Sequence, residues 1–154
     1  MAKQAQKGLS GNAAIPHQIH IAYLVTNINN NLFFSKNLKF KNNICSAETK
    51  VPKVDNKQPD VLIFDPRTSN SEKIWIEVCK KQRGLLQGDK DKINLAFKRL
   101  PHLKEGFIFV YERNEWLKYR RTKMDFIRSS KSTWLGLDLA DLVNTIHPQS
   151  WFKP

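Results

Sequence analysis

The fold is decided by residues 73–79, KIWIEVC, which form the clearest strand in the sequence. Side chains alternate between the two faces of a strand, so Ile74, Ile76 and Val78 share one face and are expected to point to the core. Trp75, Glu77 and Cys79 share the other face. Glu77 is therefore a carboxylate within an otherwise apolar strand.

Further strands and helices are expected on both sides of this strand. The expected strands are residues 44–51, 61–64, 73–79 and 106–112; the expected helices are residues 15–29, 89–100, 116–129 and 135–146. Residues 31–41 are expected to be a strand or irregular. The asparagines at 27 and 29–31 are expected to end the first helix. Residues 84–88 are expected to end the strand at 73–79. Strands followed by helices predict an α/β (α+β) domain with a central mixed β-sheet flanked by helices.

The apolar faces of the helices follow from a spacing of three and four residues. The expected face of the first helix is Ile15, Ile19, Ala22, Tyr23 and Thr26; that of the second is Ile93, Ala96, Phe97 and Leu100; that of the last is Leu135, Leu139, Leu142, Val143 and Ile146.

Length and composition limit the classes of protein to which this chain can belong. The chain has 154 residues, 40% of them hydrophobic, and a mean hydropathy of −0.53. This suits one folded domain and excludes a disordered chain. The longest unbroken apolar runs have five residues, whereas a transmembrane helix needs about 20. Residues 1–12 are expected to form a flexible N-terminus and residues 13–154 a single domain.

The cysteines and the N-terminus indicate the compartment. The two cysteines, Cys45 and Cys79, form no disulfide framework. No apolar segment follows Lys3 and Lys7, so no signal peptide is expected. The protein is therefore expected to be cytoplasmic.

The charge is the most informative property of the composition. Lys and Arg number 26 against 14 Asp and Glu, a formal charge of +12 with a pI of about 9.9. Such a surplus favours a polyanionic partner, nucleic acid first, although a basic surface without a partner is the simpler alternative. Most of the surplus lies in residues 80–131, interleaved with Trp116, Tyr119 and Phe126. The residues expected to bind nucleic acid are Lys118, Arg120, Arg121, Lys123 and Arg128.

Two acidic residues are placed to converge. Asp60 opens the strand at 61–64, so a hairpin with residues 73–79 would bring Asp60 and Glu77 to one end of the sheet. Two close carboxylates repel unless a cation lies between them or one stays protonated. Mg²⁺ is a suitable cation, because it prefers oxygen ligands and takes one or two carboxylates with a substrate phosphate. The alternative is a pair of surface carboxylates without a metal.

The pattern Pro59-Asp60, an apolar run, and Ile76-Glu-Val-Cys-Lys80 resembles the PD-(D/E)XK nuclease superfamily. The segment from Glu77 through Asp91-Lys92-Ile93 to Glu105-Gly-Phe-Ile-Phe also resembles small bacterial members of this group. The resemblance covers residues 48–111 and implies a restriction-endonuclease-like core of order αβββαβ. It implies Mg²⁺ or Mn²⁺ as cofactor, Asp60 as the central metal ligand and Glu77 as the second acid. Family members often place a further Glu in the leading helix; this helix has no acid, which leaves Glu48 as the additional ligand or as an exposed strand residue.

The chain departs from the family motif at Cys79, which stands where the motif has lysine. A thiol supplies no permanent positive charge, and its pKa rises beside a carboxylate. Lys92, at the start of the next helix, is the preferred replacement. Lys80 is the second choice, because it needs a bulge to reach the same face. A third alternative is that catalysis has been lost.

Other chemistries are disfavoured by spacing. The four histidines show no pairing with Cys79 and no zinc-ligand spacing with the cysteines. His17 and His20 are expected to be surface and packing residues.

These features predict a metal-dependent, endonuclease-like phosphodiesterase acting on nucleic acid, with DNA favoured. The alternatives are a catalytically inactive nucleic-acid-binding or regulatory module of the same fold, and a module that binds an acidic protein. The last helix with Trp134, Trp151 and Phe152 would provide a homodimer surface or cap the core.

Overall fold

The computed structural model describes residues 14–80 and 83–144. Its helices are α2 (Ala14–Phe34), α3 (Arg83–Arg99) and α4 (Leu139–Asn144), with short 3₁₀ turns η1 (Leu38–Phe40), η2 (Pro52–Val54) and η3 (Tyr111–Arg113). Its strands are β1 (Ile44–Ala47), β2 (Val61–Phe64), β3 (Ile74–Cys79), β4 (Glu105–Val110), β5 (Glu115–Arg120), β6 (Asp125–Arg128), β7 (Lys131–Ser132) and β8 (Leu137–Asp138). Within these residues, no helix has the length and apolar character needed to cross a membrane.

Strands β1 to β6 form one mixed sheet in sequence order. β3 and β4 are parallel, and the other neighbouring pairs are antiparallel. A parallel pair needs a long crossover connection, which α3 supplies. The predicted fold class, a mixed sheet with flanking helices, is confirmed.

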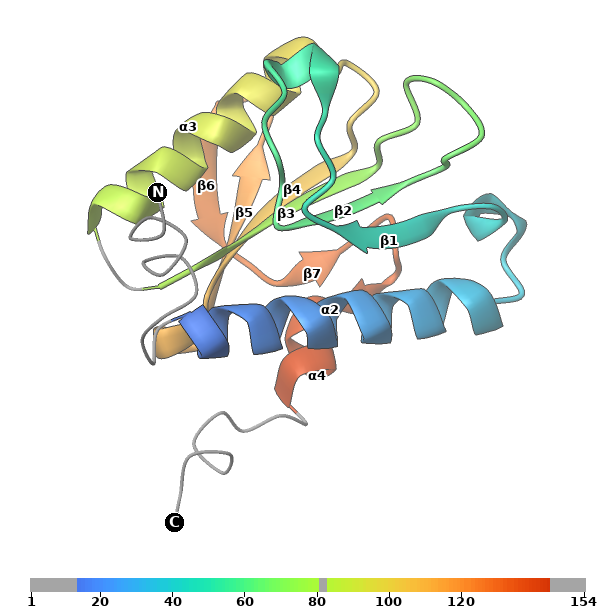
Figure 1. The fold of residues 1–154 in the computed structure, drawn as a ribbon, viewed down its shortest axis with the longest axis horizontal. Helices are drawn as coiled ribbons and strands as arrows, with labels where there is room; N and C mark the ends of the chain where they lie inside the picture. The colour runs from blue at the N-terminus through green and yellow to red at the C-terminus, as the bar shows by residue number, and fades with distance from the viewer. Residues whose placement is uncertain (1–13, 81–82, 145–154) are drawn as a thin grey trace, which may run out of the picture.

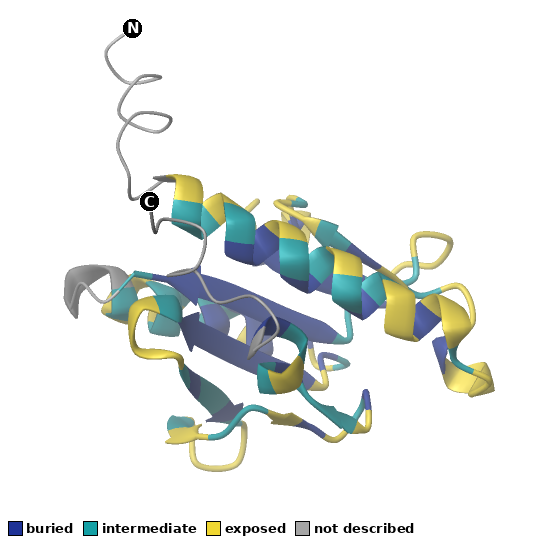
Figure 2. Cartoon of the chain, turned by 90° about the horizontal axis from the view of Figure 1, so that it is seen from below, coloured by how far each residue is buried: buried dark blue, intermediate teal, exposed yellow. Residues whose placement is uncertain are grey.

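Helices cover both faces of the sheet, with α2 and α4 on one face and α3 on the other (Figure 1). All residues of β3 and β4 are buried, as expected for strands covered on both faces. Figure 2 shows the sheet as mostly buried and α2 as exposed along its outer side. The face of β3 that carries Glu77 is therefore buried as well, under α3.

The first helix is longer than predicted and turned differently. It continues through the asparagines to Phe34, because Asn29 pairs with the backbone of Cys45 and Asn27 donates to the carbonyl of Leu142. These bonds to other segments satisfy side chains that otherwise favour turns. Its buried apolar residues are Ile21, Leu24, Ile28 and Leu32, whereas Ile15 is 53% exposed.

The basic segment at 116–129 is not a helix, and this prediction was wrong. It forms the hairpin β5–β6, with Met124 at a positive φ of 52° in the turn. Trp116 and Tyr119 are three residues apart, a spacing that puts them on one face of a helix and on opposite faces of a strand. Here Trp116 packs on the α2 side and Tyr119 on the α3 side.

Several further boundaries differ from expectation, and β1 ends at Ala47 instead of residue 51. α3 begins at Arg83, so residues 84–88 are helical and do not form a break between β3 and the helix. Packing of the helix outweighs the low helix propensity of Gly88. Its predicted face, Ile93, Ala96, Phe97 and Leu100, is buried. α4 begins only at Leu139, after the β7–β8 pair. Residues 1–12, Ile146, Trp151 and Phe152 lie outside the described residues.

Gly106 and Gly88 provide a matched test of the packing between α3 and β4. A Cβ at Gly106 would lie 2.7 Å from Cε2 of Phe97 and 2.9 Å from Cγ2 of Ile93, whereas a Cβ at Gly88 meets nothing within 4 Å. We expect Gly106→Ala to lower the free energy of unfolding by about 1–3 kcal/mol. Gly88→Ala should raise it by up to about 1 kcal/mol. Urea denaturation measures both, and equal effects of the two substitutions would contradict this packing.

Candidate acidic site at the end of strands β2 and β3

The hairpin of β2 and β3 brings Asp60 and Glu77 together, as predicted. Val61 pairs with Ile76, so Asp60 lies beside Glu77. The backbone N–H of Asp60 donates to Oε2 of Glu77 at 3.2 Å. The carboxylate of Asp60 in turn accepts a hydrogen bond of 2.7 Å from the backbone N–H of Val78. Each acid is thus held by the other strand.

Glu77 is a fully buried carboxylate with donors at both oxygens. Its Oε1 lies 2.5 Å from Nζ of Lys92, and its Oε2 also accepts from Nε1 of Trp75 at 2.9 Å. Lys92 additionally donates to the carbonyl of Gln58 at 3.2 Å. The next residue on α3, Ile93, is fully buried, which fixes the position from which Lys92 reaches the sheet.

The structure separates the two lysines proposed in place of the motif lysine. Lys92 contacts Glu77, whereas the ammonium of Lys80 lies 3.7 Å from the carboxylate of Glu112, on η3. Cys79 is buried, and burial, with Asp89 nearby, raises the pKa of its thiol to about 12. Cys79 therefore carries no charge at neutral pH, in agreement with the prediction for this thiol.

A third carboxyl group, Asp89 on α3, belongs to the same cluster. Burial raises its pKa to about 6, Lys92 opposes that shift, and the charge of Asp60 adds to it. For Glu77, burial and then the charge of Asp60 raise the pKa to about 8, against the effect of Lys92. Sequence reasoning missed Asp89, because its helix was expected to begin at that residue and the acid was counted only as part of the basic segment.

His17 is a second residue that sequence reasoning missed. Its Nε2 lies 2.9 Å from the carbonyl oxygen of Val78 and 3.5 Å from Oδ2 of Asp60. The hydrogen bond with Asp60 outweighs burial and raises the pKa of His17. His20, by contrast, is a packing residue, stacked on Tyr111 at 4.7 Å between ring centroids. The helix has no acid that could join Asp60 and Glu77, and His17 is the residue of this helix that lies beside Asp60. The missing acid was the available signal that another side chain of the helix faces the cluster.

Glu48 lies next to Asp60 through the backbone. Its N–H donates to the carbonyl of Asp60 at 3.3 Å, and its own backbone has a positive φ of 53°. The exposed side chain accepts a hydrogen bond of 3.4 Å from Gln18. The structure therefore brings Glu48 to the edge of the cluster, with its carboxylate at Gln18.

The five basic residues expected to bind nucleic acid lie on the β5–β6 hairpin and its turn. Lys118 lies 3.0 Å from the carboxylate of Glu105, and Arg120 pairs with Asp125 through two hydrogen bonds. Arg121 donates to carbonyl groups after α3. Lys123 and Arg128 are exposed. Arg128 also lies 3.5 Å from the carboxylate of Glu115, so four of the five charges have partners within the chain.

The donor types of the cluster fit a hard divalent cation, which prefers carboxylate oxygens. Beyond the effect of burial, the charge of Asp60 raises the pKa of both Glu77 and Asp89, and a cation would relieve that repulsion. In the structure, the positive charges next to these carboxylates are those of Lys92, beside Glu77, and of His17 when protonated, beside Asp60. In residues 14–80 and 83–144, no group of three or more His, Cys, Asp or Glu side chains is arranged to hold a metal ion.

Lys92→Met tests the ion pair with buried Glu77. Removing one partner of a buried pair costs about 3–5 kcal/mol, and Lys92 keeps 25% of its side chain exposed, so we expect a loss of about 3 kcal/mol at pH 8. Because the pKa of Glu77 is raised, the folded chain holds a proton that the unfolded chain releases, and stability falls as pH rises above about 4.5. Without the ammonium the pKa of Glu77 rises further, so this dependence extends to higher pH and the loss should be larger at pH 8 than at pH 5.

Urea denaturation at pH 5 and pH 8 measures this effect. Lys90→Met is the matched control, since Lys90 lies on the same helix over the ring of Phe126, at 5.7 Å. It should cost less than about 1 kcal/mol at either pH. Equal losses for the two variants, or a loss in Lys92→Met that is independent of pH, would exclude the ion pair as the cause.

Neither a scan against protein-family models nor a search of curated proteins finds a match for this chain. The resemblance to the PD-(D/E)XK superfamily therefore stays a prediction, supported only by the residues themselves. The function of the chain has to be inferred from the geometry of the acidic cluster.

Proposed function

We propose that this protein is a metal-dependent, endonuclease-like phosphodiesterase that acts on nucleic acid, with DNA as the favoured substrate. The observation that carries the proposal is the meeting of Asp60, Glu77 and Lys92 from β2, β3 and α3, with the ammonium 2.5 Å from the Glu77 carboxylate. Two acids and a lysine at one sheet end are the groups that phosphodiester hydrolysis with a metal ion requires.

Mg²⁺ or Mn²⁺ is the cofactor of this proposal. Asp60 and Glu77 would hold the ion, with Glu48 as an additional ligand. When bound, such an ion polarises a phosphodiester and lowers the pKa of a bound water. The charges of the cluster support a cation, because Asp60, Glu77 and Asp89 outnumber His17 and Lys92 when all five are ionised.

The chain's own residues have separable roles in this proposal. Lys92, held against Glu77, would offset negative charge that develops on the phosphate in the transition state. The formal charge of +12 favours a polyanionic substrate. The proposed location of the protein is the cytoplasm. Both cysteines are buried and free, and thiols stay reduced in that compartment.

A second function is favoured by the ion pairs themselves. Both oxygens of Glu77 accept hydrogen bonds within the chain, which also suits a structural role for these charges. The protein would then be an inactive nucleic-acid-binding module of the same fold. Such a module would bind DNA with strong salt dependence and leave it uncut.

Cleavage of supercoiled plasmid and of single-stranded DNA tests the proposal. We expect cutting with Mg²⁺ or Mn²⁺, none with excess EDTA, and a rate lowered about 100-fold or more by Asp60→Asn. Asn keeps an oxygen that can accept the hydrogen bond from Val78, so the strand pairing should survive. The rates are read from the conversion of supercoiled to nicked plasmid.

Asp91→Asn is the matched control for this experiment. Asp91 is an exposed carboxylate on α3, directly before Lys92, and accepts a hydrogen bond from Gln87. It should cleave within about twofold of the unmodified chain, as surface substitutions usually do little. Equal cleavage by all three proteins would assign the activity to a contaminant, and salt-dependent binding without cleavage would favour the inactive module.

Metal binding is tested separately from cleavage. A cation that binds the folded chain alone raises its thermal midpoint in proportion to the logarithm of its concentration. We expect MnCl₂ to raise the midpoint of the unmodified chain and of Asp91→Asn, and to leave that of Asp60→Asn unchanged. CaCl₂ at the same ionic strength controls for screening. The same rise in Asp60→Asn would place the ion elsewhere.

A further inference from the structure

The segment between β1 and β2, residues 48–60, forms a loop of fixed shape beside the acidic cluster. Figure 1 shows it rising from the sheet to η2, which lies next to the end of α3. Near its base, the backbone N–H of Val51 donates to the carbonyl of Lys57 at 2.9 Å. The side chains of Val51 and Val54 are buried on the α3 side of the sheet. Backbone bonds and core packing therefore hold the positions from which the outward side chains of this loop start.

The outward side chains of the loop are basic. Lys50, Lys53 and Lys57 are exposed. The only acid between them is Asp55, whose negative charge is offset by Arg99 at 3.3 Å. Lys53 donates a hydrogen bond to the β2–β3 turn. Within the described residues, Lys50 and Lys57 form neither an ion pair nor a side-chain hydrogen bond. These two ammonium groups are thus open to an anion from outside the chain.

Backbone contacts place both lysines beside the acids. Lys50 is two residues after Glu48, whose N–H donates to the carbonyl of Asp60. Lys57 directly precedes Gln58, whose carbonyl accepts a hydrogen bond from α3 within the acidic cluster. One extended residue spans at most about 3.6 Å, so the Cα of Lys57 lies within about 11 Å of the Cα of Asp60. An anion that reaches Asp60 therefore passes close to this loop.

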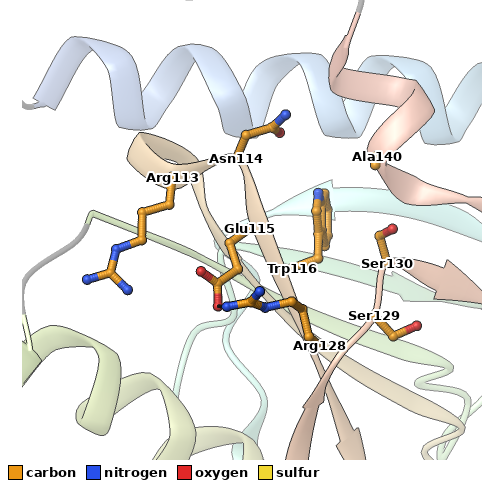
Figure 3. A pocket seen from close by; sticks show the side chains of 8 residues that line it. All are labelled: Arg113, Asn114, Glu115, Trp116, Arg128, Ser129, Ser130 and Ala140. Atoms are coloured by element: carbon orange, nitrogen blue, oxygen red, sulfur yellow. Dashed lines mark ion pairs between the residues drawn. The ribbon is translucent and has the colours of Figure 1, made fainter.

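The basic residues of the β5–β6 hairpin are less suited to hold a polyanion at the acids. Figure 3 shows the guanidinium group of Arg128 beside the carboxylate of Glu115, at a distance of 3.5 Å. In the sheet, β6 lies four strands from β2, which is about 19 Å at about 4.8 Å per strand. The loop lysines are closer to Asp60 and, among the described residues, have no competing carboxylate.

We propose that Lys50 and Lys57 bind neighbouring phosphate groups of a nucleic-acid strand, so that the loop positions this strand at Asp60. Lys57 forms a bridge with Val51, and Lys50 precedes Val51, so the two lysines stand on adjacent stretches of backbone. Lysine binds phosphate as a point charge, and phosphate contacts fix the register of a strand without reading its sequence. The choice of nucleic acid as the polyanion rests on the proposed function, whereas the phosphate-binding loop does not.

The salt dependence of binding to a labelled, short oligothymidylate measures these contacts. The titration uses the full chain with EDTA, which prevents metal-dependent cleavage, and reads fluorescence anisotropy at several KCl concentrations. We expect the double variant Lys50→Gln with Lys57→Gln to bind about tenfold more weakly or worse at about 0.1 M KCl. The slope of log affinity against log salt should shrink by about 1.4, because each phosphate contact with a single strand contributes about 0.7.

Lys36→Gln with Lys41→Gln is the matched control, because it removes the same charge from two exposed lysines that follow α2. His17 lies at the acids, and α2 ends at Phe34, about 26 Å further on at about 1.5 Å per residue. Charges so far apart are screened at about 0.1 M salt, so the affinity should stay within about twofold and the slope should not change. An unchanged slope in the loop variant, the same loss in both variants, or no binding by the unmodified chain would overturn the proposal.

Plasmid cleavage with MnCl₂ separates this proposal from the proposed nuclease. If both hold, the loop variant should raise KM and leave kcat unchanged, because it loses binding that substrate and transition state share. A reduced salt slope in the loop variant, with no cleavage by the unmodified chain, would keep the loop and remove the nuclease. Cleavage that depends on Asp60, with an unchanged salt slope in the loop variant, would remove the loop alone.

Discussion

The buried carboxylate of Glu77 is the constraint on which the arrangement of this fold depends. It lies at 0% exposure in a strand whose six residues are all buried. A carboxylate there is tolerable only when charge and hydrogen bonds compensate for lost water. The donors come from the backbone before β2, from Trp75 on β3 and from Lys92 on α3. One side chain thus fixes three elements relative to one another at the end of the sheet.

The same constraint brings several acidic and basic side chains together at the end of the sheet. Burial, and after it the charge of Asp60, raises the pKa of both Glu77 and Asp89, and Lys92 opposes both shifts. A purely structural role would be served as well by an apolar residue at position 77, since buried ion pairs rarely add net stability. The stability of the sheet alone does not account for three acids in one place, and the proposed function rests on this arrangement.

Much of the fold and the centre of the site could be predicted from the sequence, and the failures have physical causes. Short-range patterns identified β2, β3 and α3, and their pairing brought Asp60, Glu77 and Lys92 together. His17 and Asp89 were missed because their contacts join segments remote in sequence, which no local spacing encodes. The β5–β6 hairpin was mistaken for a helix because Trp116 and Tyr119 satisfy either periodicity, and only packing on both faces decides between them.

The distribution of the basic charge follows from that hairpin. A helix would have left the basic side chains of residues 118–128 spread around its surface, whereas the hairpin ties Lys118, Arg120 and Arg121 to partners within the chain. The positive charge that stays open to an anion is then local, as at Arg113, Lys123 and Arg128, whose side chains are exposed. The proposed recognition of nucleic acid therefore depends on a few separate exposed side chains and not on one continuous basic helix.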